Sequence, residues 1–250
     1  MSETAIPAIS IERLSHDYSG KPVLHDLELS VAAGEIFGFL GHNGAGKTTT
    51  MNILTTLVKP ASGTVTLFGE DAFADSARAR SMLGYLPENV NFYDNLTTME
   101  NLHYLGRLSG LRDPKPRIRQ TLDYLDFTAH IDERVGSFSK GMRQRVGLAQ
   151  AILHEPKILF LDEPTSGLDP SGVKQVRDLV LKLNRELGMT IFMNTHLLSE
   201  VSLTCTSIGV LSAGRLVYHD SLQETLQRFP TESSLEEIYY AVGGSNGGMG

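Results

Sequence analysis

A glycine-rich segment at residues 41–49 carries the strongest chemical signal in the sequence. It reads Gly-His-Asn-Gly-Ala-Gly-Lys-Thr-Thr and matches the phosphate-loop pattern G-x-x-x-x-G-K-[ST]. Small residues let such a loop wrap around an anion with its backbone N–H groups pointing inward, and a following helix N-terminus adds partial positive charge. Lys47 can reach terminal phosphates, and the Thr48 hydroxyl can ligate Mg²⁺. The predicted triphosphate-binding residues are Asn43, Gly44, Ala45, Gly46, Lys47, Thr48 and Thr49.

The surroundings of this loop favour phosphate binding over the alternative, a simple glycine turn before a helix. An apolar run at 36–40 precedes the loop and predicts a buried strand. Met51, Ile53 and Leu54 follow it at helical spacing. Strand, glycine loop and helix in this order are the context that a phosphate-binding loop requires.

A second motif, which is acidic, predicts the residues that bind the metal ion and activate water. The apolar run at 158–161 reads as a strand that ends in Asp162 and Glu163. Ligands gather at the carboxyl ends of parallel strands, so both acids are expected beside the phosphate loop. Asp162 can hold Mg²⁺ directly or through water, and Glu163 can orient and polarise an attacking water. The alternative is a pair of acids that caps the turn at 164–165; the phosphate loop favours the chemical interpretation.

Two further segments place polar residues where an anion could bind. Ser139 and Gly141 open a helix that starts near Lys140, and a helix N-terminus suits an anion, although Ser139 could equally be a plain N-cap. His196 follows the predicted strand at 190–194. A lone histidine is more often structural, but a position at a strand end beside the site favours function.

Composition limits the classes of protein to which the chain can belong. A net charge of −7 argues against a nucleic-acid binder, because such proteins are usually basic. Cys205 is the only cysteine, which excludes an intrachain disulfide and a cysteine metal cluster. No apolar run approaches the length of a membrane span, and the first residues do not resemble a signal peptide. We therefore expect a cytosolic protein.

The remaining pattern predicts an α/β fold with a mostly parallel sheet, helices on both faces, an antiparallel β subdomain and a helical subdomain. The helical subdomain is expected at about 90–150, within a domain at 1–230, and a C-terminal helix with a disordered glycine-rich tail at 231–250. Expected strands lie at 6–14, 23–31, 36–40, 64–68, 83–86, 157–161, 190–194 and 208–211, and a turn is expected at 20–22 between the first two. Expected helices lie at 76–82, 97–125 with a break near 110–116, 140–153 and 170–187.

Taken together, residues 6–228 resemble the ATP-binding-cassette (ABC) ATPases, which have a P-loop NTPase fold. Residues 138–142 resemble the family's signature loop, usually Leu-Ser-Gly-Gly-Gln, and residues 166–169 resemble its D-loop. His196 corresponds to the family's switch histidine, and Tyr18 to an aromatic residue that stacks on adenine, although Tyr18 could also be a tyrosine of the core. Residues 84–88 align with the Q-loop, with Glu88 in place of the usual glutamine.

The resemblance implies the cofactors ATP and Mg²⁺ and a set of roles. Glu163, His196 and Lys47 would be catalytic. Thr48, Glu88 and Asp162 would face the metal ion. Nucleotide contacts would come from the loop, Tyr18 and Asp169, and from Ser139 and Gly141 of a partner cassette. Met142 in place of glutamine and Lys140 in place of glycine depart from the usual signature, but the catalytic positions are intact, so we expect an active ATPase.

The resemblance also implies partners. Two cassettes would bind head to tail on ATP, as a homodimer or with a second cassette, and drive separate transmembrane permease subunits on the cytoplasmic face of the cell membrane. Residues 88–111, with Phe92, Tyr93 and Leu96, correspond to the contact with those subunits. The sequence looks like that of an exporter-type ATPase. It is also similar to the ATPase of the nitrous-oxide-reductase maturation transporter. A soluble ABC ATPase acting on ribosomes or DNA, a P-loop kinase or GTPase, and an inactive cassette are the alternatives; no nucleic-acid partner is expected.

Overall fold

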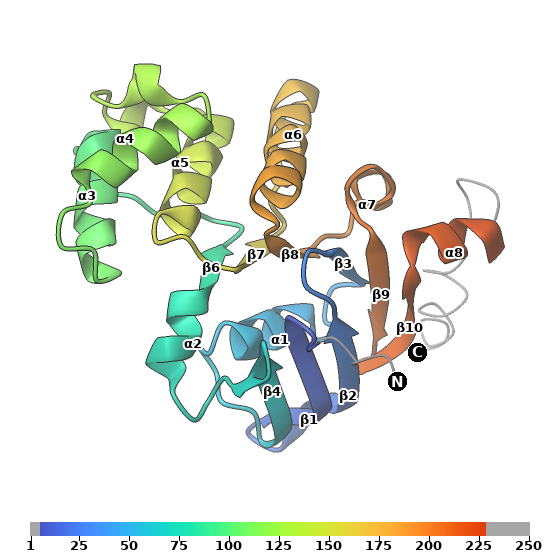
Figure 1. Ribbon diagram of the computed structural model, residues 1–250. Helices are drawn as coiled ribbons and strands as arrows, with labels where there is room; N and C mark the ends of the chain where they lie inside the picture. The colour runs from blue at the N-terminus through green and yellow to red at the C-terminus, as the bar shows by residue number, and fades with distance from the viewer. Residues whose placement is uncertain (1–5, 229–250) are drawn as a thin grey trace.

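A computed structural model describes residues 6–228 and contains two sheets with helices around them (Figure 1). The smaller sheet has the strand order β2-β1-β4-β5, and the larger one has the order β10-β9-β3-β8-β7-β6. The strands are β1 (Ile9–Tyr18), β2 (Lys21–Val31), β3 (Ile36–Gly41), β4 (Ser62–Leu67), β5 (Glu70–Asp71), β6 (Leu83–Leu86), β7 (Ile158–Asp162), β8 (Thr190–Asn194), β9 (Ser207–Ser212) and β10 (Arg215–Ser221).

The helices lie mostly where their periodicity predicts them. They are α1 (Lys47–Leu54), α2 (Ser76–Met82), α3 (Thr98–Leu108), α4 (Lys115–Tyr124), α5 (Lys140–Ile152), α6 (Pro170–Leu187), α7 (Leu198–Thr204) and α8 (Leu222–Arg228), with short 3₁₀ turns η1 (Thr128–His130) and η2 (Val135–Ser137). Asp169 caps α6 at its start, and Gly188 ends it in the left-handed conformation. Throughout the part of the chain that the structure describes, every helix is too short or too polar to span a lipid bilayer.

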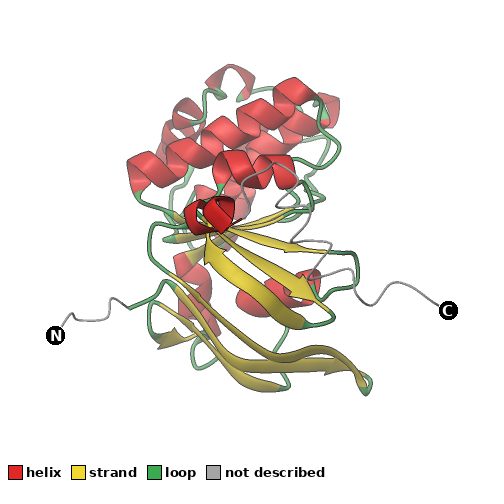
Figure 2. Ribbon diagram, turned by 90° about the vertical axis from the view of Figure 1, so that its right-hand side faces the viewer, coloured by secondary structure: helices red, strands yellow, loops and turns green. Residues whose placement is uncertain are grey.

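The larger sheet is buried on both faces, because its parallel strands are packed between helices on one side and α1 with the smaller sheet on the other (Figure 2). Side chains alternate along each strand, so Leu159 and Leu161 of β7 face the helices while Ile158 and Phe160 face the smaller sheet. Two hydrophobic cores result, one on each face. This rigid sheet holds the ends of β3, β7 and β8 in register.

The antiparallel subdomain is confirmed, but its first turn is shorter than expected. We expected strands at 6–14 and 23–31 joined by a turn at 20–22; β1 and β2 instead run on to a two-residue turn. Ser19 and Gly20 have φ angles of 52° and 79°, the left-handed pair that closes a tight hairpin. Pro22 is tolerated in a strand because β2 lies at the edge of its sheet.

Several elements escaped the sequence prediction. They are β10, α7 and α8, together with the two-residue strand β5 and the short turns η1 and η2. Ala213 and Gly214 have left-handed φ angles of 46° and 76° and join β9 to β10 as a second tight hairpin. The predicted C-terminal helix and glycine-rich tail at 231–250 lie outside the described residues. The helical subdomain expected at about 90–150 corresponds to α3, α4 and α5, which stand at the left of Figure 1.

A cluster of phenylalanines fixes the spacing of the central strands. Phe192 of β8 is fully buried, with its ring centre 5.2 Å from those of Phe37 and Phe39 and 5.6 Å from that of Phe160. Phe192→Ala should therefore lower the free energy of unfolding by about 3–5 kcal/mol, measured by urea denaturation. Leu187→Ala, at a leucine that is 56% exposed, is the control and should change it by less than about 0.5 kcal/mol. Equal losses in the two variants would contradict this account of the core.

Candidate functional site

The phosphate-loop sequence forms the predicted strand, loop and helix. β3 is buried along its whole length and leads into a loop in which Gly44 and Gly46 have φ angles of 83° and 110°. Only glycine adopts such angles without strain, which explains these residues in the motif. Gly46 is the N-cap of α1 and has no side chain with which to cap it. The N–H groups of the first turn are thus left for an anion.

Lys47 is held under this loop by two backbone carbonyls. Its Nζ donates to the oxygens of Gly41 at 2.6 Å and His42 at 3.3 Å, and the residue is only 7% exposed. Burial lowers the pKa of Lys47, while the charges of Glu163 and Asp162 act to raise it. A desolvated cation next to free N–H groups favours a phosphate. Thr48, Asn43 and Gly44 are exposed at the same place, whereas Ala45 and Thr49 are buried and support the loop.

Asp162 lies at the carboxyl end of β7, opposite Asn194 in the parallel register. Its carboxylate accepts a hydrogen bond from Asn194 at 2.5 Å and one from the Tyr85 hydroxyl at 3.5 Å. Burial raises the pKa of Asp162, and the charges of Glu163 and Glu88 raise it further; the Asn194 hydrogen bond and Lys47 oppose them. Burial and Asp162 also raise the pKa of Tyr85 to about 12.

Tyr85 and Asn194 are functional neighbours that sequence reasoning did not assign. Each lies in a strand next to β7, and Asn194 ends β8 where Asp162 ends β7. The signal that could have revealed Asn194 is therefore its strand-end position, which it shares with His196 in the Asn194-Thr195-His196 segment. Tyr85 carries no such signal, because it lies inside β6.

Glu163 and His196 are in direct contact, as their strand-end positions predict. Nδ1 of His196 lies 2.8 Å from Oε2 of Glu163, whose side chain is 14% exposed while that of His196 is 53% exposed. Glu163 has a φ of 47°, which is strained for a residue with a Cβ atom. Its backbone N–H donates to the Asn194 carbonyl at 2.9 Å, which keeps it in this conformation.

Glu88 joins the same group through Ser166 and Asp162. Oε1 of Glu88 accepts a hydrogen bond from the Ser166 hydroxyl at 3.4 Å, and its charge acts on Asp162. The structure therefore brings together the loop at 43–49 with Glu88, Asp162, Glu163 and His196. We call this the loop cluster. It contains carboxylate and hydroxyl oxygens, one buried ammonium group and the N-terminus of α1.

Ser139, Gly141 and Asp169 lie elsewhere, around a cavity of about 370 Å³ that also touches His130 and Arg145. Ser139 and Asp169 each cap the helix that follows: Ser139 accepts from the N–H of Met142 at 3.3 Å, and Asp169 from that of Gly172 at 3.1 Å. The N-cap interpretation of Ser139 is thus confirmed. No residue from 43–49 is among the described residues that line this cavity. We call Ser139, Gly141 and Asp169 the signature cluster.

Tyr18 lies at the end of the β1–β2 hairpin. It pairs with Lys21 in the antiparallel register, and its ring meets that of His16 edge to face at 4.7 Å. Tyr18 is otherwise accessible to solvent, with 46% of the residue exposed. Farther along β2, Leu24 packs so closely on the phosphate loop that a Cβ atom at Gly46 would meet it at 2.7 Å. The β1–β2 hairpin thus packs against the phosphate loop.

The raised pKa of Asp162 gives a test of this site by pH. The native state holds the Asp162 proton more tightly than the unfolded chain does, so the ionised form costs stability at neutral pH. That cost decreases as the pH falls below the raised pKa of the native state, and it is gone once the pH is below the ordinary aspartate pKa of the unfolded chain. Asp162→Asn should therefore be more stable than the wild type at neutral pH and lose this advantage in acid, measured by urea denaturation at several pH values.

The control is Asp178→Asn, at an exposed carboxylate that lies 2.8 Å from Lys174 on α6. It should not gain stability at neutral pH. If Asp162→Asn is no more stable than the wild type at any pH, the electrostatic account of the loop cluster is wrong.

Comparison with known proteins identifies the family of this chain. The sequence pattern described as "ABC transporter" matches residues 24–166, which is more than half of the chain. The ABC transporter ATP-binding protein YhcH of Bacillus subtilis (strain 168) is 40% identical over 210 residues, which cover 84% of this chain and 68% of that protein. The bacitracin transport ATP-binding protein BcrA of Bacillus licheniformis is 40% identical over 204 residues, covering 82% and 66%.

Solved structures are similar along almost the whole chain. The ATP-binding subunit of an ABC transporter has a TM-score of 0.82 at 28% identity, covering 94% of this chain and 99% of that one. cbiO1 of Clostridium perfringens, part of the ABC transporter complex cbiONQ, has a TM-score of 0.79 at 25% identity, covering 93% and 99%. The expected α/β P-loop fold is confirmed. This chain belongs to the ABC transporter family and is one of its ATP-binding subunits, which hydrolyse ATP to power transport.

Proposed function

We propose that this chain acts as one of two cassettes that bind head to tail, each closing over the ATP that the other holds. One observation carries the proposal: the residues expected to bind a single ATP fall into two groups, and the loop at 43–49 does not contribute to the described lining of the signature-cluster cavity. A partner subunit would bring its Ser139 and Gly141 to the loop cluster. The partner is a second copy of this chain or another cassette.

Within each loop cluster, Lys47 and the N–H groups at the start of α1 would hold the phosphates. Glu163 would orient and polarise the attacking water, and His196, which contacts Glu163, would hold the γ-phosphate. Tyr18 would stack on the adenine ring, and Asp169 would line the approach of the partner. A mostly buried carboxylate suits the role of Glu163, because low exposure strengthens its interaction with a bound water.

The donor set at the carboxyl edge fits Mg²⁺. Thr48, Glu88 and Asp162 offer only oxygen ligands, which a hard cation prefers. No group of three or more acidic, histidine or cysteine side chains among the described residues is arranged as a metal cage. Mg²⁺ does not need such a cage, since it is usually held by one or two carboxylates together with substrate phosphates and water. When bound, it would neutralise charge that develops on the phosphates.

We also propose that separate transmembrane permease subunits contact residues 88–111, on the cytoplasmic face of the membrane. Tyr93 and Tyr104 support this, because their rings meet edge to face at 5.5 Å and remain 54% and 46% exposed. We propose export rather than import because the sequence resembles exporter-type ATPases; among the relatives, BcrA is named for bacitracin transport. The similarity to the ATPase of the nitrous-oxide-reductase maturation transporter stays a prediction, as does the absence of a nucleic-acid partner.

Glu163→Gln separates binding from hydrolysis. The variant should keep its affinity for ATP, lose at least about 100-fold in turnover, and accumulate as a dimer with ATP, because removal of the general base leaves the phosphate contacts in place. Phosphate release and light scattering after gel filtration measure the two properties. Turnover at the wild-type rate would show that Glu163 does not activate water.

Mixing two inactive variants tests whether the site is shared. Lys47→Ala damages the loop cluster, and Gly141→Asp damages the signature cluster. A Cβ atom at Gly141 meets its nearest neighbour only at 3.9 Å, so an aspartate should be tolerated by the fold. A head-to-tail pair of the two variants has one undamaged site, so an equal mixture should recover up to about one quarter of wild-type turnover through random pairing.

Each variant alone should stay inactive at any protein concentration. Recovery on mixing cannot occur when each subunit completes its own site. An inactive mixture in which gel filtration detects mixed dimers would contradict the head-to-tail arrangement.

A further inference from the structure

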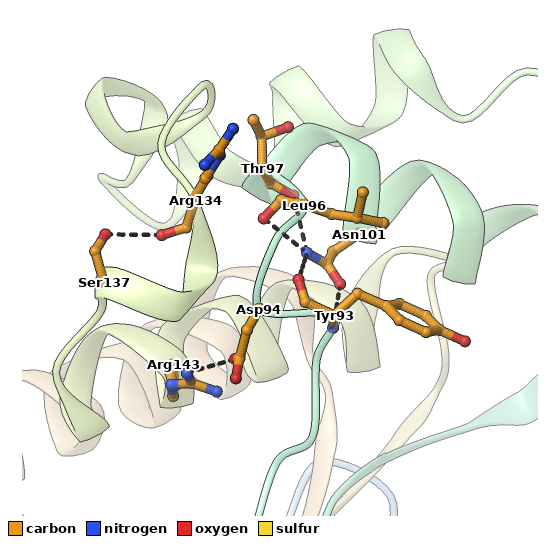
Figure 3. A network of polar contacts seen from close by, with 8 residues as sticks. All are labelled: Tyr93, Asp94, Leu96, Thr97, Asn101, Arg134, Ser137 and Arg143. Carbon is orange, nitrogen blue, oxygen red and sulfur yellow. Dashed lines mark hydrogen bonds and ion pairs between the residues drawn. The ribbon is translucent and has the colours of Figure 1, made fainter.

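The segment at 93–97 connects two surfaces that the proposed function keeps apart. At one end, Tyr93 presents its ring on the proposed permease surface (Figure 3). The segment also contacts a second stretch, residues 133–137, which leads directly into the signature cluster at Ser139. The contacts between these two stretches determine whether a force on the first can reach the second.

Asn101 of α3 holds the segment in one shape. The residue is fully buried, and its side chain uses both ends (Figure 3). Its Oδ1 accepts from the Tyr93 N–H at 2.9 Å, and its Nδ2 donates to the carbonyls of Tyr93, Leu96 and Thr97 at 3.1, 3.3 and 3.0 Å. Such a network is costly to break, because the buried amide group of Asn101 would be left without its hydrogen-bond partners. The segment therefore moves as a unit with the start of α3.

Backbone hydrogen bonds attach this unit to the stretch before the signature cluster. The Gly136 N–H donates to the Asp94 carbonyl at 3.0 Å, and the Val135 N–H donates to the Leu96 carbonyl at 3.1 Å. A Cβ atom at Gly136 would lie 2.7 Å from the Asp94 carbonyl oxygen, so this approach requires glycine. The two stretches are in backbone contact.

A side-chain contact then reaches α5 itself. Asp94 Oδ1 accepts from Arg143 Nη2 at 2.6 Å, and Arg143 lies in the first turn of the helix that Ser139 caps (Figure 3). One turn further on, a Cβ atom at Gly147 would meet Leu86 at 2.6 Å and Val90 at 3.0 Å, so the chain after β6 packs tightly there. Gly147 and Arg143 are four residues apart and lie on one helix face.

Between these two points of attachment the packing is open. A cavity of about 390 Å³ separates residues 88–91 from the start of α5, and Glu88, Lys140 and Arg143 are among its lining residues. A helix held firmly at Gly147 and bordered by a cavity can tilt at its N-terminus. Arg143 lines this cavity, and its ion pair with Asp94 limits the tilt.

We propose that Asp94 is a positioning residue for ATP hydrolysis: through Arg143 it fixes the direction of the first turn of α5, and so the placement of Ser139 and Gly141 against the partner's ATP. A permease subunit that displaces Tyr93 would then change the affinity between the cassettes without touching the nucleotide. The inference rests on the proposed head-to-tail function.

The test measures ATP-dependent dimerisation of the full chain carrying Glu163→Gln, by analytical ultracentrifugation. Adding Asp94→Asn should raise the dimer dissociation constant about tenfold, since a dimer contains two copies of a contact worth about threefold each. Binding of a fluorescent ATP analogue to the monomer should not change. Asp94→Glu, which keeps the charge, should recover most of the loss. Asp94→Asn with Arg143→Gln should be no weaker than the worse single variant.

A second measurement separates positioning from a general loss of structure. In the otherwise wild-type chain, turnover of Asp94→Asn should recover as protein concentration rises, whereas misfolded protein stays inactive at every concentration. Asp178→Asn breaks an exposed ion pair with Lys174 on α6 and serves as the matched control. A dimer of Asp94→Asn as tight as its parent, or additive losses in the double variant, overturns the inference alone. A parent that forms no dimer with ATP overturns the proposed function and the inference with it.

Discussion

The structure depends on an electrostatic arrangement at the carboxyl edge of the larger sheet. The buried ammonium group of Lys47 lies near the carboxylates of Asp162 and Glu163, where little solvent reaches it. Burial works against the charged forms of both Lys47 and Asp162, and each lessens the cost to the other. The cation and the carboxylates remain close only because three strand ends are fixed next to one another. A polyanion with a divalent cation matches this distribution, since it meets positive charge on one side and negative charge on the other.

Parallel pairing supplies that fixed geometry. Asp162 and Asn194 are opposite in register at the ends of β7 and β8, and β3 delivers the phosphate loop from the strand beside β8. The side chains behind them are packed on both faces, so the strands cannot slide without opening a core. The same rigidity does not extend to the start of α5, which borders a cavity. The subunit thus combines a stiff nucleotide edge with a helix whose body is packed in the core but whose first turn borders a cavity.

Much of the fold could be predicted because its signals are local. The α6 helix lies at the predicted bounds, since a capping aspartate, a regular apolar face and a left-handed glycine all agree. β10 was missed because its side chains alternate only between exposed and half-buried positions, which leaves a weak apolar pattern. The turn after β1 was misplaced because Pro22 looks like a turn residue, while its position at a sheet edge is a property of the tertiary structure.

The site was predictable to the extent that it follows strand ends. The loop cluster collects the residues expected from the phosphate loop and the acidic strand, with Glu88 and His196 beside them. Tyr85 could not be assigned, because it lies inside a strand and contacts Asp162 only through the pairing of neighbouring strands; Asn194 was missed although its strand-end position was a signal. The separation of Ser139 and Gly141 from the loop is also invisible to periodicity. It depends on how the helical subdomain packs, and no local pattern encodes that packing.

The backbone of Glu163 has a consequence for how this chain can change. A φ of 47° suits glycine or asparagine and strains any larger residue. Substitution by glycine would therefore relax the main chain, and selection for thermal robustness alone would favour it. The glutamate at this position therefore carries a cost in backbone strain. If Glu163 activates water as proposed, stability and turnover place opposite demands on this position, and a stabilised variant that lacks its carboxylate would be well folded and inactive.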